Sequence, residues 1–170
     1  KSYNLYLVED NAECFLGYYK NKVVGSFGDF SSFSFQASKH MTCGEGGILL
    51  TKDEELADKA RAFSSLGYAN LSSKKGRISK EDIQSPNYDR HISLGFNYRL
   101  SEPGAAIALA QLERLERLVN QRMKCAKFFL KAIDSFSFIN HQITPENCIN
   151  SYWTLGLVLE SNDNDKDWFN

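Results

Sequence analysis

The feature that most constrains this chain is a short apolar run near its start that stops at two acidic residues. Residues 5–8 are rich in strand formers, and Glu9 and Asp10 follow directly. Such a run is typical of a buried strand in a parallel sheet, with polar groups at its carboxyl end. Because ligands bind at that edge of open α/β sheets, the edge beside Asp10 is the first candidate site.

A second and a third strand are expected further along the chain. Residues 31–35 end in Phe-Ser-Phe, which places Ser34 opposite two phenylalanines and leads the chain to Lys39. Residues 48–50 are apolar and follow the loop Gly44-Glu45-Gly46-Gly47, whose tight bend requires glycine. Side chains from such successive strand ends should converge on one crevice.

A hairpin and a helix accompany these strands. Residues 18–25 predict a small hairpin with Asn21-Lys22 as its turn. Apolar residues at helical spacing predict a helix from about residue 54 to 66, and Gly67 is its stop signal. Strands followed by a helix favour an α/β fold.

The later half of the chain is expected to be helical first and then β. Residues 101–119 predict a helix with Ser101 as N-cap and Pro103 in the first turn. Its apolar stripe consists of Ala108, Leu112, Leu115 and Val119. A second helix over 123–133 is expected to bend toward a further domain, because residues 152–159 begin strands of their own.

Residues 68–91 are polar and have no period, which predicts a long mobile loop rather than a domain boundary. Two interpretations of this loop remain open: a solvated surface loop, or a lid over a substrate.

Composition excludes several classes of function. The 20 basic and 21 acidic residues give a net charge of -1, which disfavours a nucleic-acid partner. The 4 cysteines lie far apart, so we expect free thiols and a cytoplasmic location. No apolar run approaches the roughly 20 residues of a membrane span, and no cluster has metal-ligand spacing, so neither a membrane nor a metal is expected.

Five ordered segments of this sequence resemble the motifs of the DegT/DnrJ-type sugar aminotransferases. They are Val8-Glu9-Asp10-Asn11-Ala12, Phe33-Ser34-Phe35-Gln36-Ala37-Ser38-Lys39, Gly44-Glu45-Gly46-Gly47, Leu94-Gly95-Phe96-Asn97-Tyr98-Arg99-Leu100-Ser101-Glu102 and Ala105-Ala106-Ile107. The order and the spacing both match over about residues 3 to 130. A series of ordered motifs is more discriminating than any single glycine pattern.

The resemblance implies that Lys39 is the catalytic residue. In this family, the lysine after the Phe-Ser-Phe segment forms a Schiff base with pyridoxal 5'-phosphate (PLP), and Lys39 has that position. A flexible primary amine can attack an aldehyde, be displaced by an amino donor and carry a proton, none of which arginine can do.

The resemblance also implies four cofactor contacts besides Lys39. Asp10 matches the acid that keeps the pyridine nitrogen protonated, so that the ring can take up electrons. Ser34 matches the hydroxyl that binds the phosphate. Asn97 matches a residue that reaches the phosphate of a neighbouring subunit, which implies a homodimer with a shared site. Glu13 stands near the ring, where relatives usually carry glutamine or histidine, so the sequence departs from the family's pattern at this position.

The resemblance leaves more than one activity open. The leading interpretation is transfer of an amino group from glutamate or glutamine to a keto sugar carried on a nucleotide, as in polysaccharide biosynthesis. One branch of the family removes a hydroxyl instead and has histidine in place of the lysine, but here His40 follows that position rather than occupying it. A non-catalytic protein that keeps the fold is the third interpretation. The identity of the acceptor is not readable from the sequence.

The implied fold is α/β: part of the large domain of a fold-type I PLP-dependent transferase, with a mixed, mostly parallel sheet flanked by helices. Residues 1–122 would form the later part of that PLP-binding domain. Residues 123–170 would form a linking helix and the beginning of a small C-terminal α+β domain. The family's N-terminal phosphate-binding turn and ring-stacking aromatic have no counterpart here, so we expect a fragment that is not catalytically competent alone.

Overall fold

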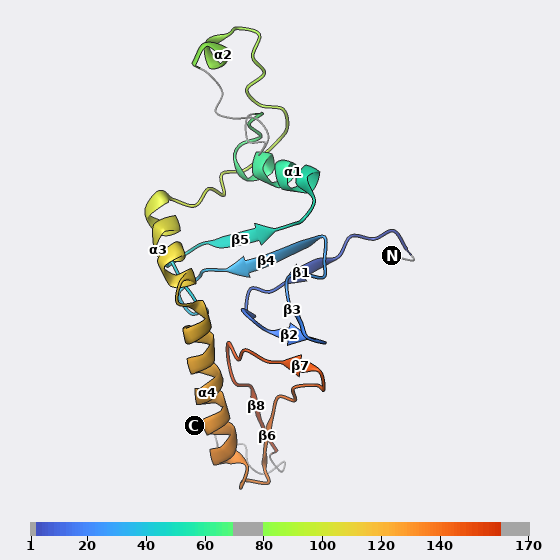
Figure 1. Cartoon of the computed structure of the whole chain (residues 1–170), viewed down its shortest axis with the longest axis vertical. Helices are drawn as coiled ribbons and strands as arrows, with labels where there is room; N and C mark the ends of the chain where they lie inside the picture. Colours follow the sequence, from blue (N-terminus) through green and yellow to red (C-terminus); the bar gives the residue numbers. More distant parts are fainter. Residues whose placement is uncertain (1–2, 70–79, 161–170) are drawn as a thin grey trace.

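A computed structural model describes residues 3–69 and 80–160 of the chain. Within these residues, the strands are β1 (Val8–Asp10), β2 (Tyr18–Tyr19), β3 (Lys22–Val23), β4 (Phe30–Ser34), β5 (Gly47–Leu50), β6 (Ile139–His141), β7 (Cys148–Ile149) and β8 (Leu157–Leu159). The helices are α1 (Glu54–Ser64), α2 (Lys80–Gln84), α3 (Glu102–Leu112) and α4 (Leu115–Ile133). The helices α3 and α4 run down one side of the molecule, and the strands lie beside them (Figure 1).

The central sheet has the order β1-β4-β5 and is mixed, as expected. The strands β1 and β4 are parallel, with Asp10 opposite Ser32, whereas β4 and β5 are antiparallel, with Ser34 opposite Gly47. Glycine is required before β5, because Gly44 has a φ of 91° and a side chain on Gly47 would lie 2.9 Å from the Phe33 carbonyl oxygen. The expected strands over 31–35 and 48–50 are therefore confirmed.

The prediction of a buried strand over residues 5–8 is wrong. The strand β1 includes both acids and only the last residue of the apolar run, and Leu5, Tyr6 and Leu7 are exposed. The physical reason is local. Leu7 uses both its backbone groups on Asp29: its N–H donates to the carboxylate, and its carbonyl accepts from the Asp29 N–H. The ladder with β4 therefore begins one residue later.

The expected hairpin is present, but its turn is shifted by one residue. Strands β2 and β3 pair antiparallel, and Lys20 and Asn21 form the turn in place of the predicted Asn21-Lys22. Both turn residues have positive φ, 47° and 62°, which suits the twist of a two-residue hairpin. The strand β7, more than 120 residues later in the chain, adds to the other edge of β2. This pairing ties the end of the described chain to its start.

The first helix is confirmed close to its predicted bounds. Asp53 is the N-cap, and its carboxylate accepts hydrogen bonds from the N–H groups of Glu55 and Leu56. The helix ends at Ser64, slightly earlier than predicted, and Gly67 follows with a φ of 73°. The left-handed residue that ends the helix is Leu66, with a φ of 60°, and the N–H of Gly67 after it donates to the Ala62 carbonyl oxygen.

The prediction of a helix break near residue 123 is wrong. Ser101 caps α3 as predicted, its hydroxyl accepting from the Gly104 N–H, but α3 ends at Leu112 and α4 runs unbroken from Leu115 to Ile133. The break falls at Arg114, whose ψ of 3° leaves the helical range. The helical spacing of the apolar residues continues across this turn and does not predict it. Of the predicted stripe, Ala108, Leu115 and Val119 are buried, whereas Leu112 is exposed.

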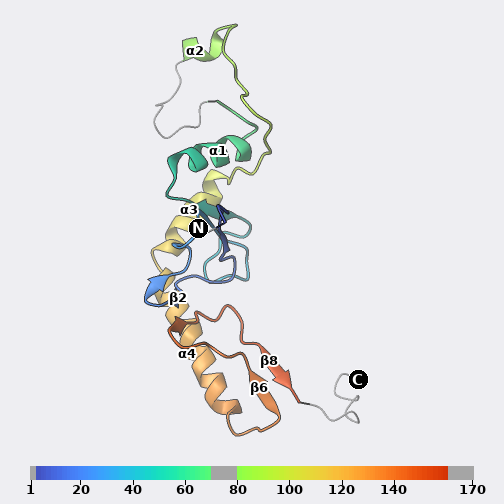
Figure 2. The ribbon, with the colours of Figure 1, turned by 90° about the vertical axis from the view of Figure 1, so that its right-hand side faces the viewer.

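The excursion over 68–91 begins and ends at one place. The backbone of Tyr68 pairs with that of His91, and the Ala69 N–H donates to the Arg90 carbonyl. The short helix α2 lies at the far end of this excursion and was not predicted (Figures 1 and 2). Residues 70–79 lie outside the described part, so the choice between a lid and a solvated loop stays a prediction.

The expected strands over 152–159 are confirmed only at their end. The strand β8 covers Leu157–Leu159 and pairs with β6, while residues 152–156 form a loop. The reason is that Tyr152, with a φ of 52°, and Trp153 turn back toward the central sheet. The proposed division at residue 122 falls inside α4 and stays a prediction.

The core lies between the central sheet and the helices. Its buried members are Phe15, Phe35, Met41, Ala108, Leu115 and Val119. Phe15 packs on both Phe33 and Phe35, with ring centroids 5.1 and 6.4 Å apart, so the two phenylalanines share a face as predicted. The cysteines Cys14, Cys43, Cys125 and Cys148 are all free thiols. None of the helices in the described residues is long and apolar enough to cross a membrane.

Candidate active site

Lys39 lies in the loop after β4, and its amine contacts an acid from the loop after β1. The Nζ atom is 2.9 Å from the Oε1 atom of Glu13. Only 12% of the Lys39 side chain is exposed, against 56% for Glu13. The same Nζ lies 4.1 Å from the centroid of the Trp153 ring, within the range of a cation–π contact. The structure therefore brings Lys39 and Glu13 together and adds an aromatic face.

The backbone of the Lys39 loop is held from two distant segments. The Arg122 guanidinium, on α4, donates to the carbonyl oxygens of Ser38 and Lys39 at 3.0 and 3.1 Å. The Trp153 indole N–H also donates to the Ser38 carbonyl, at 3.1 Å. Within the loop, the Lys39 N–H donates to the Gln36 carbonyl. Four hydrogen bonds thus fix the main chain that carries the amine.

Asp10 ends β1 and is exposed. One carboxylate oxygen, Oδ1, accepts from the Ala12 N–H at 3.1 Å and from the Ser32 hydroxyl at 3.4 Å. Within the described part of the chain, the other oxygen, Oδ2, has no recorded hydrogen-bond partner. The carboxylate is thus oriented by its neighbours but keeps an oxygen for a cationic ligand.

Ser34 lies on the same face of the sheet as Asp10. Asp10 pairs with Ser32, and residues two apart on a strand point the same way, so Ser32 and Ser34 both accompany the carboxylate. The Ser34 hydroxyl oxygen accepts from the Gln36 N–H at 3.2 Å, which leaves the hydroxyl proton for another acceptor. Asp10 and Ser34 therefore stand as the sequence predicted, at the ends of adjacent strands.

Asn97 contacts neither the Lys39–Glu13 pair nor the sheet face that carries Asp10 and Ser34. It is exposed and lies near the end of α1, where its backbone pairs with that of Ser65. Its side-chain oxygen accepts from Arg99 Nε at 3.0 Å. A role for Asn97 in the same chain's site has no support in this geometry, and the predicted role across a dimer is not tested by it.

Glu9 binds the backbone of a neighbouring loop, a role that the sequence did not predict. It points to the sheet face opposite Asp10, where its carboxylate accepts from the backbone N–H groups of Gly25, Phe27 and Gly28 at 2.7, 2.7 and 2.6 Å. Burial raises the pKa of Glu9, but these amides and the charge of Lys22 outweigh burial and hold the pKa below its ordinary value. Of these two adjacent acids, Glu9 therefore has a structural role, and Asp10 faces the candidate site.

His40, which follows Lys39 in the chain, is buried and contacts the segment around Ser151. Its Nε2 lies 3.0 Å from the Ser151 carbonyl oxygen, so this nitrogen carries the proton in the neutral ring. Burial lowers the pKa of His40; the Ser151 bond opposes the shift, and the charges of Arg122 and Lys39 add to it. His91 and His141 are exposed and contact backbone carbonyls. No metal cluster occurs among the described residues.

Arg122 and Trp153 are the site residues that the sequence prediction missed. Arg122 belongs to an exposed-looking charged stretch of a helix, and Trp153 lies in a segment that read as a strand. The one available signal was the tryptophan, because a large aromatic with a donor N–H usually finds a partner when partly buried.

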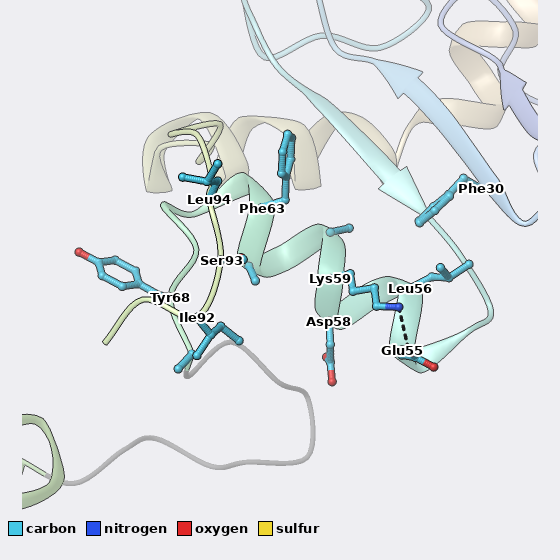
Figure 3. Close-up of a pocket in the computed structure, with 13 residues that line it drawn as sticks. Phe30, Glu55, Leu56, Asp58, Lys59, Phe63, Tyr68, Ile92, Ser93 and Leu94 are labelled. Atoms are coloured by element: carbon cyan, nitrogen blue, oxygen red, sulfur yellow. Dashed lines mark hydrogen bonds and ion pairs between the residues drawn. The ribbon is translucent and has the colours of Figure 1, made fainter. Parts of the chain in front are cut away.

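Two pockets differ in their relation to this site. A pocket of about 410 Å³ lies behind the Lys39 loop and is lined by His40, Arg122, Tyr152 and Trp153, among others. Another, of about 720 Å³, lies between α1 and the segment 92–94, and its charged lining residues are Asp58 and the Glu55–Lys59 ion pair (Figure 3). None of the five predicted site residues lines either pocket, and only the first pocket adjoins the site, through Arg122 and Trp153.

Comparison with known proteins gives a consistent result. The model of the DegT/DnrJ/EryC1/StrS aminotransferase family matches residues 1–169. GDP-perosamine synthase of Escherichia coli is 33% identical over 161 residues, which are 95% of this chain and 40% of that protein. UDP-4-amino-4,6-dideoxy-N-acetyl-beta-L-altrosamine transaminase of Campylobacter jejuni is 33% identical over 134 residues, which are 79% of this chain and 32% of that protein.

A solved structure extends the likeness to three dimensions. The E. coli GDP-4-keto-6-deoxy-D-mannose-3-dehydratase with bound hydrated PLP matches with a TM-score of 0.81 and 27% identity, over 95% of this chain and 41% of that one. This likeness confirms the expected fold class. The chain spans 40% or less of the length of the two relatives above.

Proposed function

Because this chain belongs to the DegT/DnrJ/EryC1/StrS aminotransferase family, we propose that it carries part of the active site of a PLP-dependent sugar aminotransferase. The proposed reaction transfers an amino group from glutamate or glutamine to a keto sugar linked to a nucleotide. The observation that carries the proposal is the position of Lys39, whose amine is shielded on one side by Trp153 and faces the carboxylate of Glu13.

The residues present fit PLP in their chemistry. The cofactor supplies an aldehyde that exchanges amines and a ring that takes up electrons. Lys39 offers an amine, Asp10 offers a carboxylate oxygen without a partner among the described residues, and Ser34 offers a hydroxyl proton. These three groups are suited to an aldehyde, a protonated ring nitrogen and a phosphate, respectively. The two relatives above are more than twice as long as the part that this chain matches, and further phosphate and ring contacts are proposed to come from regions that this chain does not span.

Lys39 is proposed to hold the cofactor and to move the proton. Its side chain is flexible and ends in a primary amine, so it can leave its binding position and return to it. Glu13 accepts a hydrogen bond from that amine, which gives Lys39 a defined resting position when its amine is free. The Trp153 ring covers the same atom and restricts access of water to it.

Asp10 is proposed to hold a proton on the ring nitrogen of the cofactor. An opposite charge at hydrogen-bond distance favours the charged form of its partner. The Ala12 N–H and the Ser32 hydroxyl keep the carboxylate oriented. Ser34, on the same sheet face, is proposed to bind the phosphate, and Asn97 to contact the phosphate of a second subunit in a homodimer.

The second candidate is dehydration of the sugar, since the solved dehydratase shares this fold. Two observations favour amino transfer. First, Lys39 occupies the position of the family's cofactor-binding lysine. Second, His40 is buried against the Ser151 carbonyl and Phe15. A histidine so enclosed is not placed to move a proton at an exposed ligand.

The test is product analysis with the intact protein. We expect the protein, given PLP, glutamate and a nucleotide-linked keto sugar, to release 2-oxoglutarate and an amino sugar in equal amounts. Replacing Lys39 by alanine should abolish both products, whereas the surface variant Lys52→Ala should not. A deoxygenated sugar without an amine would support the dehydratase, and a folded protein that forms neither product would contradict both candidates.

A further inference from the structure

The loop that carries Lys39 is anchored by a side chain whose role no motif of the sequence indicates. Arg122 extends from α4 and is half-buried. Its Nη2 donates to the carbonyl oxygens of Ser38 and Lys39, and its Nη1 donates to the carbonyl oxygen of Trp153 at 2.9 Å. One guanidinium therefore joins the Lys39 loop to the segment that contributes the aromatic face.

Trp153 completes this connection. Its indole N–H donates to the Ser38 carbonyl, which thus accepts from two donors, and its ring lies 4.1 Å from the Lys39 amine. The tryptophan contacts both the main chain and the side-chain end of the Ser38–Lys39 pair. Arg122 in turn holds the main chain of the tryptophan. The three residues form a closed set of contacts, which we call the lysine clamp: Arg122, Trp153 and the Ser38–Lys39 backbone.

A lysine that releases and regains its ligand in every cycle needs a main chain that is held in a fixed position. Its side chain is a flexible stem of four carbons, so the position of the amine depends on where the backbone is held. Misplacement of a reacting group by about 1 Å can cost on the order of a hundredfold in rate. The planar guanidinium suits this task, because it presents several donors in one rigid plane.

We propose that Arg122 is a positioning residue for Lys39, acting through the lysine clamp and not through contact with the substrate. This inference rests on the proposed function, because it concerns the residue that would hold the cofactor. A lysine at position 122 keeps the charge but not the planar fork, so it cannot reproduce the three contacts. The clamp also makes the site depend on Trp153, which contacts the Lys39 loop although it lies more than 110 residues after Lys39.

The first experiment does not require catalysis. In the cofactor-free intact protein, the rate at which an amine-selective acylating reagent modifies Lys39 is measured by peptide mass spectrometry. We expect Arg122→Lys to raise this rate by about 2- to 12-fold, the change that corresponds to loss of one hydrogen bond. Trp153→Phe, which keeps a ring but removes the indole N–H, should raise it similarly. Arg117→Lys, at an exposed position on the same helix, is the matched control and should leave the rate unchanged.

The second experiment uses the cofactor-loaded protein. We expect Arg122→Lys to lower kcat by about 10- to 100-fold while the KM for the amino donor changes by less than about twofold, as befits misplacement of the reacting amine. Unchanged Lys39 labelling in both variants would overturn the proposal, as would faster labelling of lysines throughout the chain. If the unaltered protein bound no PLP, the proposed function would fail, while the labelling would still decide the role of Arg122.

Discussion

Replacing Glu9 by glutamine should destabilise the loop over residues 25–28 while leaving the side of the sheet that carries Asp10 in place. The carboxylate accepts from Phe27 and Gly28 on one oxygen and from Gly25 on the other. Glutamine has a single carbonyl oxygen, so its NH2 group would meet one of these N–H groups donor to donor. One charge-assisted bond is lost outright, which costs about 1.5–3 kcal/mol, and the others weaken.

Hydrogen exchange is the suitable assay, because it reports on the loop itself. A loss of about 2–3 kcal/mol of local protection corresponds to exchange that is about 30- to 160-fold faster at the amides of Gly25, Phe27 and Gly28. Glu146→Gln, an exposed acid in another loop, is the control and should have no effect on these amides.

The pH dependence of exchange gives a second check that the Glu9 carboxylate stabilises the loop. The folded pKa of Glu9 is lowered, so its stabilisation is fully present above the ordinary value of 4.5 and is lost as the pH falls through the folded value. The difference between the two proteins should therefore shrink in acid. Equal exchange rates at neutral pH would refute the reasoning, because they would mean that the three short contacts contribute nothing.

Three further predictions concern the site and its surroundings. Asp10→Asn should lower turnover by about 10- to 1,000-fold, the equivalent of a shift of about 1 to 3 units in the ring-nitrogen pKa, with a smaller change in PLP affinity by spectral titration. Ser34→Ala should weaken PLP binding by about 10- to 150-fold, the loss of one hydrogen bond to a charged group. Because burial lowers the pKa of His40, the stability present above its ordinary value of 6.5 should fall with pH below it, by at most about 1.4 kcal/mol per unit in urea unfolding. His40→Gln should reduce that slope.

Each of these outcomes has a clear opposite. Full activity of Asp10→Asn would show that Asp10 has no role in catalysis. Unchanged PLP affinity of Ser34→Ala would show that the Ser34 hydroxyl serves only the turn at Gln36. A urea midpoint that stays constant from neutral pH to about pH 5.5 would contradict the buried, neutral state of His40.

The sequence predicted those elements whose signals are local. The strand after Asp29, the glycine-rich entry to β5 and the Ser101 cap all depend on residues within a few positions of one another. The positions of Asp10 and Ser34 at strand ends, and of Lys39 in the loop after β4, belong to this class, because each can be read from a pattern along the chain; their roles stay predictions. The placement of Asp10 and Ser34 on adjacent strands follows from the parallel pairing of β1 and β4.

The elements that the sequence did not predict depend on distant partners. The break at Arg114 changes no apolar period, and β7 is a two-residue strand that exists because β2 offers it an edge. Arg122 and Trp153 carry no pattern that points to Lys39, because the contacts run between segments more than 80 residues apart. The exposed run before β1 looked buried because composition alone does not show which strand has neighbours on both sides.

The proposed function depends most directly on the amine of Lys39. The intact protein is incubated with PLP, treated with borohydride and digested, and the peptides are analysed by mass spectrometry. We predict one borohydride-stable label on Lys39, absent after Lys39→Ala and retained after Lys52→Ala. A label spread evenly over exposed lysines, or none on Lys39 in a folded protein, would contradict the account.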